Sequence, residues 1–343
     1  MDTKIINYYE NKKLFNNCVD AIKTGKIVVF PTETVYGIGC NALNKEAVSK
    51  IYNVKGRAKD NPLIVHVGNY DISKYAKEIS DDTKKLINEF WPGPLTVILK
   101  KTSLIPDETT AGKNTVAIRM PNNEIALNLI RESECPIAAP SANISGKPSG
   151  TNVKRCIEDL KGKVDFIING NESEIGIEST VISMVNNEPI IVRPGYITYE
   201  EIKKILPNVT LYNKLNEKNS IENPISPGLK YKHYAPNCKM VIFKRNKQQI
   251  EKYLKEVSLI YNKIGILCVD EHVEFYGKID NGLTVISVGS SNNVKEIGKN
   301  LFECIRKFDD SKCDFVISEC FFEDFSNGIM NRLLRSASHN IIE

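Results

Sequence analysis

A short basic loop is the first place in this sequence where chemistry is expected. Residues 55–67 read KGRAKDNPLIVHV, in which Lys55, Arg57 and Lys59 share a loop with Asp60 before an apolar run. The guanidinium of Arg57 is a planar fork of donors that suits a phosphate or a carboxylate, and Lys55 offers a mobile point charge. Because the loop leads directly into an expected buried strand, and open sheets bind ligands at strand ends, the pattern predicts an anion site. A solvated charged loop is the alternative.

Four other polar stretches stand next to expected buried strands. They are PTETVYG (31–37), FWPGPLT (90–96), APSANISG (139–146) and GIEST (176–180). Hydroxyl and amide groups are neutral donors, and glycines let backbone N–H groups approach a ligand closely, although turn capping would use the same residue types. Binding a nucleotide with micromolar affinity needs about 8 kcal/mol, and one hydrogen bond to a charged group contributes about 1.5–3 kcal/mol. We therefore expect a site assembled from several loops.

Two polar residues interrupt apolar strands. His66 lies on the face of its strand opposite Val65 and Val67, where a hydrogen-bonded core histidine is the alternative to a ligand-binding role. Arg119 ends the strand VAIR just before Pro121, and it could equally be a surface cation. The residues alone leave both roles open.

Several catalytic signatures are absent from the sequence, including the P-loop and the common serine-hydrolase, zinc-protease and kinase motifs. The stretch GIGCNA (37–42) fits a dinucleotide-binding glycine pattern, but a six-residue loop separates it from the preceding strand, which argues against that role. The four histidines, at 66, 233, 272 and 339, include no pair with helical spacing, so a catalytic metal site built from imidazole is not expected. An enzyme with this sequence would work by positioning and electrostatics.

Hydrophobic patterning predicts the elements that hold these loops. Residues 8–24 are typical of an amphipathic helix ended by Gly25, and 27–30 of a strand covered on both faces. Further strands are expected at 63–67, 95–99, 116–119, 136–139, 164–168, 179–183 and 189–193, with helices at 45–54, 81–90, 122–132 and 151–160. Strands and helices without strict alternation predict an α/β (α+β) fold, an open twisted mixed sheet with helices packed on it.

The length of 343 residues exceeds the range of about 250–300 residues in which single domains stop growing. Residues 207–238 are polar, contain prolines and lack periodicity, which predicts a linker. Within it, SPGLKYKHYAP (226–236) is rich enough in aromatic and basic residues to predict that it packs on something. Residues 239–343 alternate strands with helices, which predicts a small doubly wound, Rossmann-like α/β domain without an evident catalytic cluster. The expected division is 1–206, 207–238 and 239–343.

Composition limits the classes of partner. The net charge of +4 is too mild to indicate nucleic acid by charge alone. Nine cysteines without a C-x-x-C pair are typical of reduced thiols, and no apolar run is long enough for a signal or a membrane span. These features predict a cytoplasmic protein that does not associate with membranes.

Seven stretches together closely resemble the YrdC-like threonylcarbamoyl-AMP synthase family. In chain order they are PTETVYGIG, KGRAKDNPLIVHV, FWPGPLTVIL, VAIRMP, APSANISGKPSGT, GIESTVIS and IVRPGYIT. The segment SPGLKYKHYAP and the α/β domain after it resemble the long form of that family. The resemblance covers about residues 14–237 in detail, and Ala58, where many relatives have proline, leaves the cations in place.

The resemblance implies an enzyme, a nucleotidyltransferase that converts L-threonine, bicarbonate or CO2, and ATP to L-threonylcarbamoyladenylate and pyrophosphate. The product feeds the synthesis of N6-threonylcarbamoyladenosine in tRNA, so a downstream tRNA threonylcarbamoyl transferase is the implied partner, and direct tRNA binding is left open. A carbamate on the threonine amine can attack the α-phosphate itself, so such a protein needs charge and alignment and no nucleophile of its own. The resemblance implies Mg2+ as cofactor, brought by the ATP phosphates and not by protein side chains.

Carried over position by position, the resemblance implies a site with two sides. Lys55 and Arg57 would be catalytic and would face the phosphates. The ATP side would be lined by Lys55, Arg57, Asn61, Thr115, Ser141, Asn143, Ser149 and Arg193, with Tyr231, His233 and Tyr234 of the linker folded over the nucleotide. The threonine side would be lined by Thr32, Thr34, His66, Arg119, Ala139, Ser179 and Thr180, with Arg119 binding the threonine carboxylate.

Two other interpretations share the fold. An RNA-binding protein without adenylate synthesis would use a basic concave face, but the weak net charge and the lack of aromatic residues interleaved with the basic loop argue against it. A carbamoyl-transfer module of the hydrogenase-maturation type would add an acylphosphatase-like segment and zinc fingers, and the sequence has neither.

Overall fold

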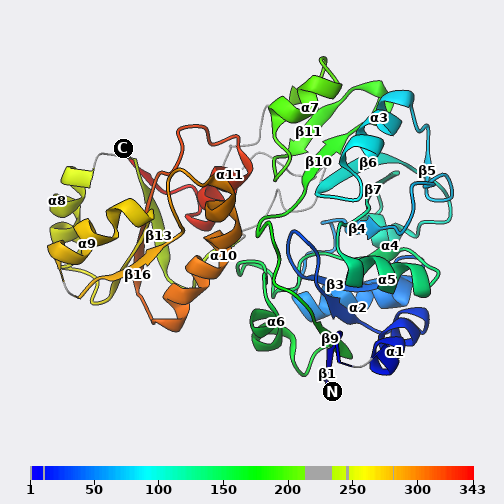
Figure 1. Ribbon diagram of the computed structural model, residues 1–343, viewed down its shortest axis with the longest axis horizontal. Helices are drawn as coiled ribbons and strands as arrows, with labels where there is room; N and C mark the ends of the chain where they lie inside the picture. The colour runs from blue at the N-terminus through cyan, green and yellow to red at the C-terminus, as the bar shows by residue number, and fades with distance from the viewer. Residues whose placement is uncertain (1, 11, 213–233, 245–246, 281) are drawn as a thin grey trace. The chain divides into compact units, whose positions relative to one another are not determined.

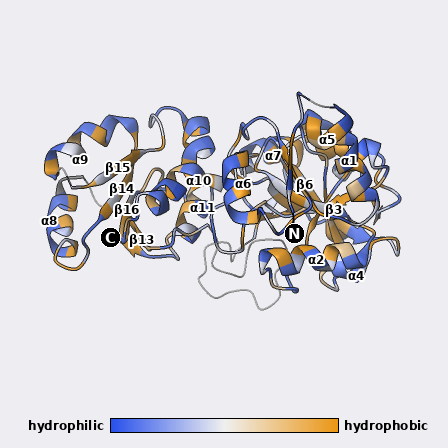
Figure 2. Ribbon diagram, turned by 90° about the horizontal axis from the view of Figure 1, so that it is seen from below, coloured by the Kyte–Doolittle hydropathy of each residue, from blue (hydrophilic) through white to orange (hydrophobic). Residues whose placement is uncertain are grey.

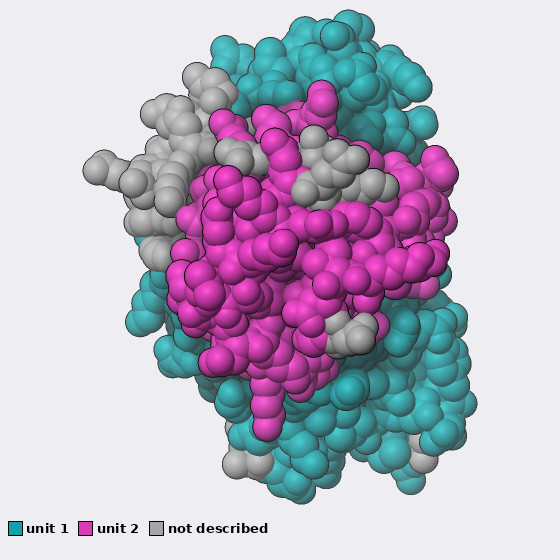
Figure 3. Space-filling model, turned by 90° about the vertical axis from the view of Figure 1, so that its left-hand side faces the viewer, with its two compact units in different colours: residues 1–145, 149–230 teal, residues 146–148, 231–343 magenta. Residues whose placement is uncertain are grey.

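The chain divides into two compact units. The structure is a computed structural model that describes residues 2–10, 12–212, 234–244, 247–280 and 282–343 (Figure 1). Unit 1 comprises residues 1–145 and 149–230, and unit 2 comprises residues 146–148 and 231–343 (Figure 3). Unit 2 thus begins before the expected boundary at Lys239 and takes in three residues from the middle of the chain. Most of the expected linker, residues 213–233, lies outside the described residues.

Unit 1 is built on one large mixed sheet. The strand order is β1-β9-β2-β3-β8-β4-β7-β6-β10-β11-β12, and β5 pairs with β6 off this path. Parallel and antiparallel pairs alternate irregularly, as expected for an open mixed sheet, so the predicted architecture is confirmed. The strands are β1 (Lys4–Asn7), β2 (Val28–Phe30), β3 (Gly37–Asn41), β4 (Ile64–His66), β5 (Ala76–Lys77), β6 (Leu95–Lys101), β7 (Thr115–Arg119), β8 (Ile137–Ala138), β9 (Phe166–Asn169), β10 (Thr180–Ser183), β11 (Ile190–Arg193) and β12 (Thr210–Leu211).

Several helices of unit 1 begin at residues whose side chains cap them. In α2, α3, α5 and α6 the side chain of Asn44, Ser80, Asn123 or Asn152 accepts a hydrogen bond from a backbone N–H of the first turn. Helix α2 ends at Gly56, whose φ of 60° is the left-handed conformation that favours glycine, so the basic loop starts directly at a helix end. The helices are α1 (Lys12–Lys23), α2 (Lys45–Lys55), α3 (Asp81–Phe90), α4 (Asp107–Thr110), α5 (Glu124–Glu132), α6 (Val153–Leu160) and α7 (Tyr199–Ile205), with a 3-10 turn, η1, at Val185–Asn187.

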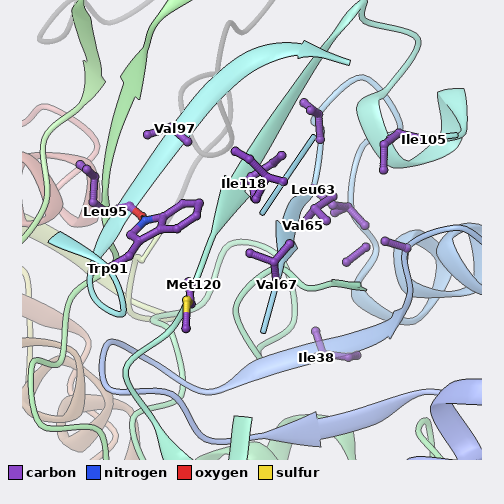
Figure 4. Close-up of a cluster of buried hydrophobic side chains, with 14 of the residues drawn as sticks. Ile38, Leu63, Val65, Val67, Trp91, Leu95, Val97, Ile105, Ile118 and Met120 are labelled. Carbon is purple, nitrogen blue, oxygen red and sulfur yellow. The ribbon is translucent and has the colours of Figure 1, made fainter. Parts of the chain in front are cut away.

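The two faces of the central strands differ in polarity. In the parallel pair β4 and β7, Val65 is opposite Ile118 and His66 is opposite Arg119. Val65 and Ile118 point into the main hydrophobic cluster, where Trp91 also lies (Figure 4). Because successive side chains of a strand point to opposite faces, His66 and Arg119 lie side by side on the other face.

Unit 2 has a five-stranded sheet in which every pair is parallel. The order is β15-β14-β16-β13-β17, and helices lie on either side of β13 and β16 (Figure 1). The strands are β13 (Lys239–Phe243), β14 (Ile264–Cys268), β15 (Thr284–Ser287), β16 (Phe315–Glu319) and β17 (Ile341–Ile342). The helices are α8 (Lys247–Val257), α9 (Val273–Ile279), α10 (Val294–Asp310) and α11 (Gly328–Ser336), and a 3-10 turn, η2 (Asp270–His272), precedes α9. The expected doubly wound domain is confirmed.

Hydropathy follows these layers in both units. The helices carry hydrophilic and hydrophobic residues on different sides, while the strands that they cover are mostly hydrophobic (Figure 2). Among the described residues, no helix has the length and apolar character that crossing a membrane requires.

We expect Gly195, which follows β11, to be intolerant of a side chain. A Cβ there would lie 2.4 Å from the backbone of both Ser179 and Thr180. Gly195→Ala should therefore lower the free energy of unfolding of unit 1 by about 2–3 kcal/mol, because backbone and not a flexible side chain must move.

The matched control for this prediction is Gly162→Ala. Gly162 has a φ of +83° but no atom within 4 Å of the added Cβ, so it carries backbone strain alone, about 1 kcal/mol. Denaturant unfolding followed by the fluorescence of Trp91, the single tryptophan, measures both variants. Equal losses of stability would show that the close approach at Gly195 is not a constraint.

Candidate functional site

Five buried polar residues form a row on one face of the central sheet of unit 1. Val181 of β10 is opposite both Thr96 of β6 and Arg193 of β11. Val97 of β6 is opposite Ile118 of β7, so the same register places Thr96 beside Arg119. We call this set the polar row; its members are His66, Arg119, Thr96, Ser179 and Arg193. Each is at most 5% exposed. A row of this kind on a core strand face indicates a binding surface, because buried polar groups need partners.

Hydrogen bonds order one end of the polar row. The hydroxyls of Thr96 and Ser179 are 2.8 Å apart. Arg193 donates from Nη2 to the Ser179 carbonyl (2.8 Å) and hydroxyl (3.1 Å). The resemblance implies that Arg193 lies on the ATP side and Ser179 on the threonine side, and the structure brings these two residues into direct contact.

The other end of the polar row carries a buried ion pair. Arg119 Nη2 lies 2.8 Å from Oε1 of Glu33, and Arg119 Nε donates to the Gly93 carbonyl at 3.2 Å. The Arg119 and Glu33 side chains are 5% and 4% exposed. The short contact between them is not aligned as a hydrogen bond, because Arg119 Nη2 and both Glu33 oxygens have no hydrogen-bond partner among the described residues.

The loop after β2 holds Glu33 in this place. Its backbone is tied to a later segment, since Ile175 N donates to the Glu33 carbonyl (2.9 Å) and Gly176 N to the Thr34 carbonyl (3.0 Å). Within the loop, the Thr32 hydroxyl donates to the Val35 carbonyl and lies 2.9 Å from the Thr34 hydroxyl. The predicted residues Thr32 and Thr34 are therefore buried near Glu33, and the Thr32 hydroxyl orders the loop itself.

His66 is a neutral imidazole beside this ion pair. Burial, followed by the neighbouring Arg119 charge, lowers the pKa of His66 to about 3. Its ring packs edge to face against Phe30, and its Nδ1 has no hydrogen-bond partner among the described residues. A neutral imidazole can serve as donor on one nitrogen and acceptor on the other.

Lys55 is buried and hydrogen-bonded, whereas the basic loop predicted a mobile point charge. It is 2% exposed, and its Nζ donates to the carbonyls of Ser141 and Asn143. Burial, and then the nearby charge of Arg57, lowers the pKa of Lys55. Lys55 is buried because α2 extends to residue 55 and residues four apart share a helix face, so Lys55 lies on the same buried face as Ile51. In the structure Lys55 fastens the 141–143 loop and is not a mobile charge.

Arg57 and Asn61 lie within the same loop. Arg57 Nε donates to the Asn61 carbonyl (3.0 Å), and its Nη2 donates to the Pro62 carbonyl (2.9 Å). Thr115, at the start of β7, lines a small cavity with Pro62 and Ala117. The guanidinium of Arg57 is half-buried, so it both orders the loop and borders solvent.

The loop after β8 carries the other residues expected on the ATP side. The Ser141 hydroxyl donates to Asn143 Oδ1, and the Ser149 hydroxyl donates to Glu178 Oε1 at 2.7 Å. The backbone N–H of Ala139 donates a hydrogen bond to the Ile64 carbonyl, with an N···O distance of 2.9 Å. Lys55 thus joins Ser141 and Asn143 into one group, whereas Ser149 is held separately by Glu178.

Two expected ligand residues have other roles in the structure. Thr180 is opposite Leu95 of the hydrophobic cluster and donates its hydroxyl to the Ile197 carbonyl (2.6 Å), so it faces away from the polar row. Tyr234 is 5% exposed and stacks on Phe302 of α10 with ring centroids 4.9 Å apart. Its ring is therefore packed inside unit 2 and does not lie open as a cover for a nucleotide. The companion predictions, Tyr231 and His233, lie outside the described residues.

Three residues of this region were missed by sequence reasoning. Glu33, Thr96 and Glu178 all contact predicted site residues. Glu33 carried the clearest signal, because it is an acidic residue in a short loop after a fully buried strand. Among the described residues there is no group of three or more histidines, cysteines or carboxylates that could hold a metal ion.

We predict that His66 makes the stability of unit 1 depend on pH. Between about pH 3 and its ordinary value of 6.5, the unfolded chain takes up a proton on His66 that the folded chain does not. The contribution of His66 to the free energy of unfolding is therefore fully present above pH 6.5. It decreases as the pH falls towards 3, by up to about 1.4 kcal/mol per pH unit. Unfolding of the protein and of His66→Gln at pH 4 to 7, followed at Trp91, should show a shallower slope in the variant. Parallel slopes would exclude this role.

We also predict that Lys55 protects the 141–145 backbone. Lys55→Met removes the donor to two carbonyls, at a cost of about 1–3 kcal/mol, so amide hydrogen exchange at Ala142 and Ser145 should accelerate about 10-fold or more. The exposed Lys59 of the same loop supplies the control, since Lys59→Met should leave these rates unchanged. Unaltered exchange in Lys55→Met would contradict the fastening role.

Comparisons with known proteins match nearly the whole chain. The Sua5, YciO and YrdC family model, described as "Telomere recombination", matches residues 20–195, and a model described as "Threonylcarbamoyl-AMP synthase, C-terminal domain" matches residues 197–338. The threonylcarbamoyl-AMP synthase of Pyrococcus abyssi is 39% identical over 331 residues, covering 94% of this chain and 93% of the relative. That of Bacillus subtilis is 42% identical over 327 residues, covering 94% and 92%.

A solved structure extends the likeness to the fold of both units. The crystal structure of P. abyssi Sua5 complexed with L-threonine is 38% identical, with a TM-score of 0.91, and the match covers 100% of this chain and 99% of that chain. The seven ordered motifs, the mixed sheet followed by a doubly wound domain, and these full-length matches lead to one conclusion: the chain belongs to the threonylcarbamoyl-AMP synthase family, in its two-domain form.

Proposed function

We propose that this chain condenses L-threonine, bicarbonate or CO2, and ATP to L-threonylcarbamoyladenylate and pyrophosphate, for the synthesis of N6-threonylcarbamoyladenosine in tRNA. Relatives that carry the name threonylcarbamoyl-AMP synthase match more than nine-tenths of this chain. The P. abyssi protein, which has the same two-unit fold, was crystallised in complex with L-threonine. Both findings support threonine as the substrate here.

One observation carries the proposal, namely the buried group of Arg119, Glu33 and His66. A buried guanidinium whose Nη2 makes no aligned hydrogen bond among the described residues is suited to a carboxylate. We assign the threonine carboxylate to Arg119. Neutral His66, on the adjacent strand, is then a hydrogen-bonding group for the amino acid and adds no second positive charge.

The nucleotide is assigned to the loops that Lys55 and Arg57 organise. Arg57 borders solvent at the loop 57–62, and Lys55 fixes the carbonyls of Ser141 and Asn143, which orients the hydroxyl and amide groups of that loop. Lys55 is thus a positioning residue, and Arg57 is the cation assigned to the phosphates. This division supports an enzyme that uses prearranged donors at the phosphates.

The chemistry needs no nucleophile from the protein. The threonine amine adds to CO2 and loses a proton to solvent, which forms a carbamate. A carbamate oxygen then attacks the α-phosphorus of ATP, a new P–O bond forms, and pyrophosphate leaves with the electrons of the broken P–O bond. Holding threonine at the sheet face and ATP at the loops 57–62 and 141–143, which adjoin β4 and β8, supplies the proximity that this second step requires.

Mg2+ has no protein site to which it can be assigned among the residues that the structure describes. They offer no group of three or more candidate ligands, so we assign the ion to the phosphate oxygens of ATP and to water. The product is an activated carbamoyl adenylate, so a transferase that moves its threonylcarbamoyl group to tRNA is the proposed partner.

The test is threonine-dependent pyrophosphate release from ATP, Mg2+ and bicarbonate by the full chain. We expect one pyrophosphate per threonylcarbamoyladenylate, with the product identified by mass spectrometry. Release at the same rate without L-threonine, or release without the adenylate, would refute the proposed activity. Tight RNA binding with no pyrophosphate release would favour the alternative of an RNA-binding protein of the same fold.

A further inference from the structure

Glu33 is a buried carboxylate whose surroundings leave it incompletely satisfied. Its side chain is 4% exposed, and its charged neighbour is Arg119, whose Nη2 lies 2.8 Å from Oε1. Neither carboxylate oxygen has a hydrogen-bond partner among the described residues. A carboxylate can accept about four hydrogen bonds, and buried polar atoms in folded proteins normally have partners.

A purely structural role for Glu33 would call for a different geometry. A carboxylate that served to neutralise Arg119 would be expected to form aligned, paired N–H···O bonds with the guanidinium, because burial of an ion pair is compensated only when geometry is good. Here the nitrogen and oxygen are close but not aligned, and Arg119 Nη2 also lacks a hydrogen-bond partner among the described residues. The loop backbone holds Glu33 in this place through Ile175 and Gly176.

The open groups together complement a zwitterion. Arg119 Nη2 is a charged donor, the Glu33 oxygens are charged acceptors, and His66 Nδ1 is a third polar atom without a partner in the described part of the chain, on the strand beside Arg119. An α-amino acid brings a carboxylate, an ammonium group and, in threonine, a hydroxyl. Its binding alongside the Arg119–Glu33 pair, with the carboxylate at Arg119 and the ammonium at Glu33, adds no net charge to the buried site, whereas an amine or a carboxylate alone would leave one charge uncompensated.

We infer that Glu33 binds the α-amino group of the amino-acid substrate, while Arg119 binds its carboxylate. This inference rests on the proposed function. Glu33 is then the residue that distinguishes an amino acid from the corresponding hydroxy acid, because only the amine offers an ammonium charge and several N–H donors. Carbamate formation from the bound ammonium releases two protons to solvent, one before the amine adds to CO2 and one afterwards. One N–H then remains, so Glu33 keeps a hydrogen bond to the reacting nitrogen.

The experiment compares two ligands on two proteins. The ligands are L-threonine and the analogue in which a hydroxyl replaces its amino group, and their dissociation constants are measured by calorimetry on the full chain. The unsubstituted protein should prefer L-threonine by at least tenfold. Glu33→Gln, which keeps the shape and removes the charge, should reduce that preference by tenfold or more, mostly through weaker threonine binding.

Two further variants keep the test decisive. Glu174→Gln removes an exposed carboxylate next to the segment that anchors the loop, and it should leave the preference unchanged. If Glu33→Gln fails to fold, as judged by Trp91 fluorescence, Glu33→Asp keeps the charge but withdraws it by one methylene. That variant should retain the preference for the amine with weaker binding of threonine.

The outcomes separate this inference from the proposed function. If Glu33→Gln weakens both ligands by the same factor, Glu33 only positions Arg119 and the inference is wrong, even though threonine-dependent pyrophosphate release persists in the unsubstituted protein. If Glu33→Asp loses the amine preference entirely, the inference is also wrong. If the unsubstituted protein neither binds L-threonine nor releases pyrophosphate in response to it, the proposed function fails and the inference with it.

Discussion

Arg119 and Glu33 carry opposite charges, lie 2.8 Å apart and have almost no exposure to water, so their pairing constrains the parts of unit 1 that bring them together. Removing one partner from a buried pair costs about 3–5 kcal/mol, because the other charge is left uncompensated. The two residues come from distant parts of the chain, a strand end and a loop. Their pairing therefore requires that β7, the loop after β2 and the segment at 175–176 all reach their places together.

Neighbouring contacts extend the same constraint across the sheet. Thr96, Ser179 and Arg193 satisfy one another on the face that Arg119 occupies, while the opposite face is filled by the main hydrophobic cluster. Four members of the polar row, His66, Thr96, Arg119 and Arg193, lie on strands of the sheet. Such placement suits a reaction that depends on the alignment of two substrates.

Lys55 shows how a charged residue can act through other residues. It uses its donors on the carbonyls of Ser141 and Asn143, so it acts by ordering the loop that carries them. The middle of that same stretch, residues 146–148, is counted with unit 2. There Arg306 donates to the Pro148 carbonyl from Nε and Nη2, and Ala235 N donates to the Gly146 carbonyl.

The sequence by itself determined the mixed sheet, the second α/β unit, the family and the inward face on which His66 lies. These follow from alternation, periodicity and ordered motifs, which are local properties of the chain. Only the tertiary structure decided that Glu33 meets Arg119, that Thr180 turns away from the polar row, and that Tyr234 packs on Phe302. It also decided that Lys55 is buried, although the helical spacing from Ile51 carried that signal. The physical reason is that a side chain's partner depends on strand register and on loops that approach from distant parts of the chain, and no local pattern encodes either.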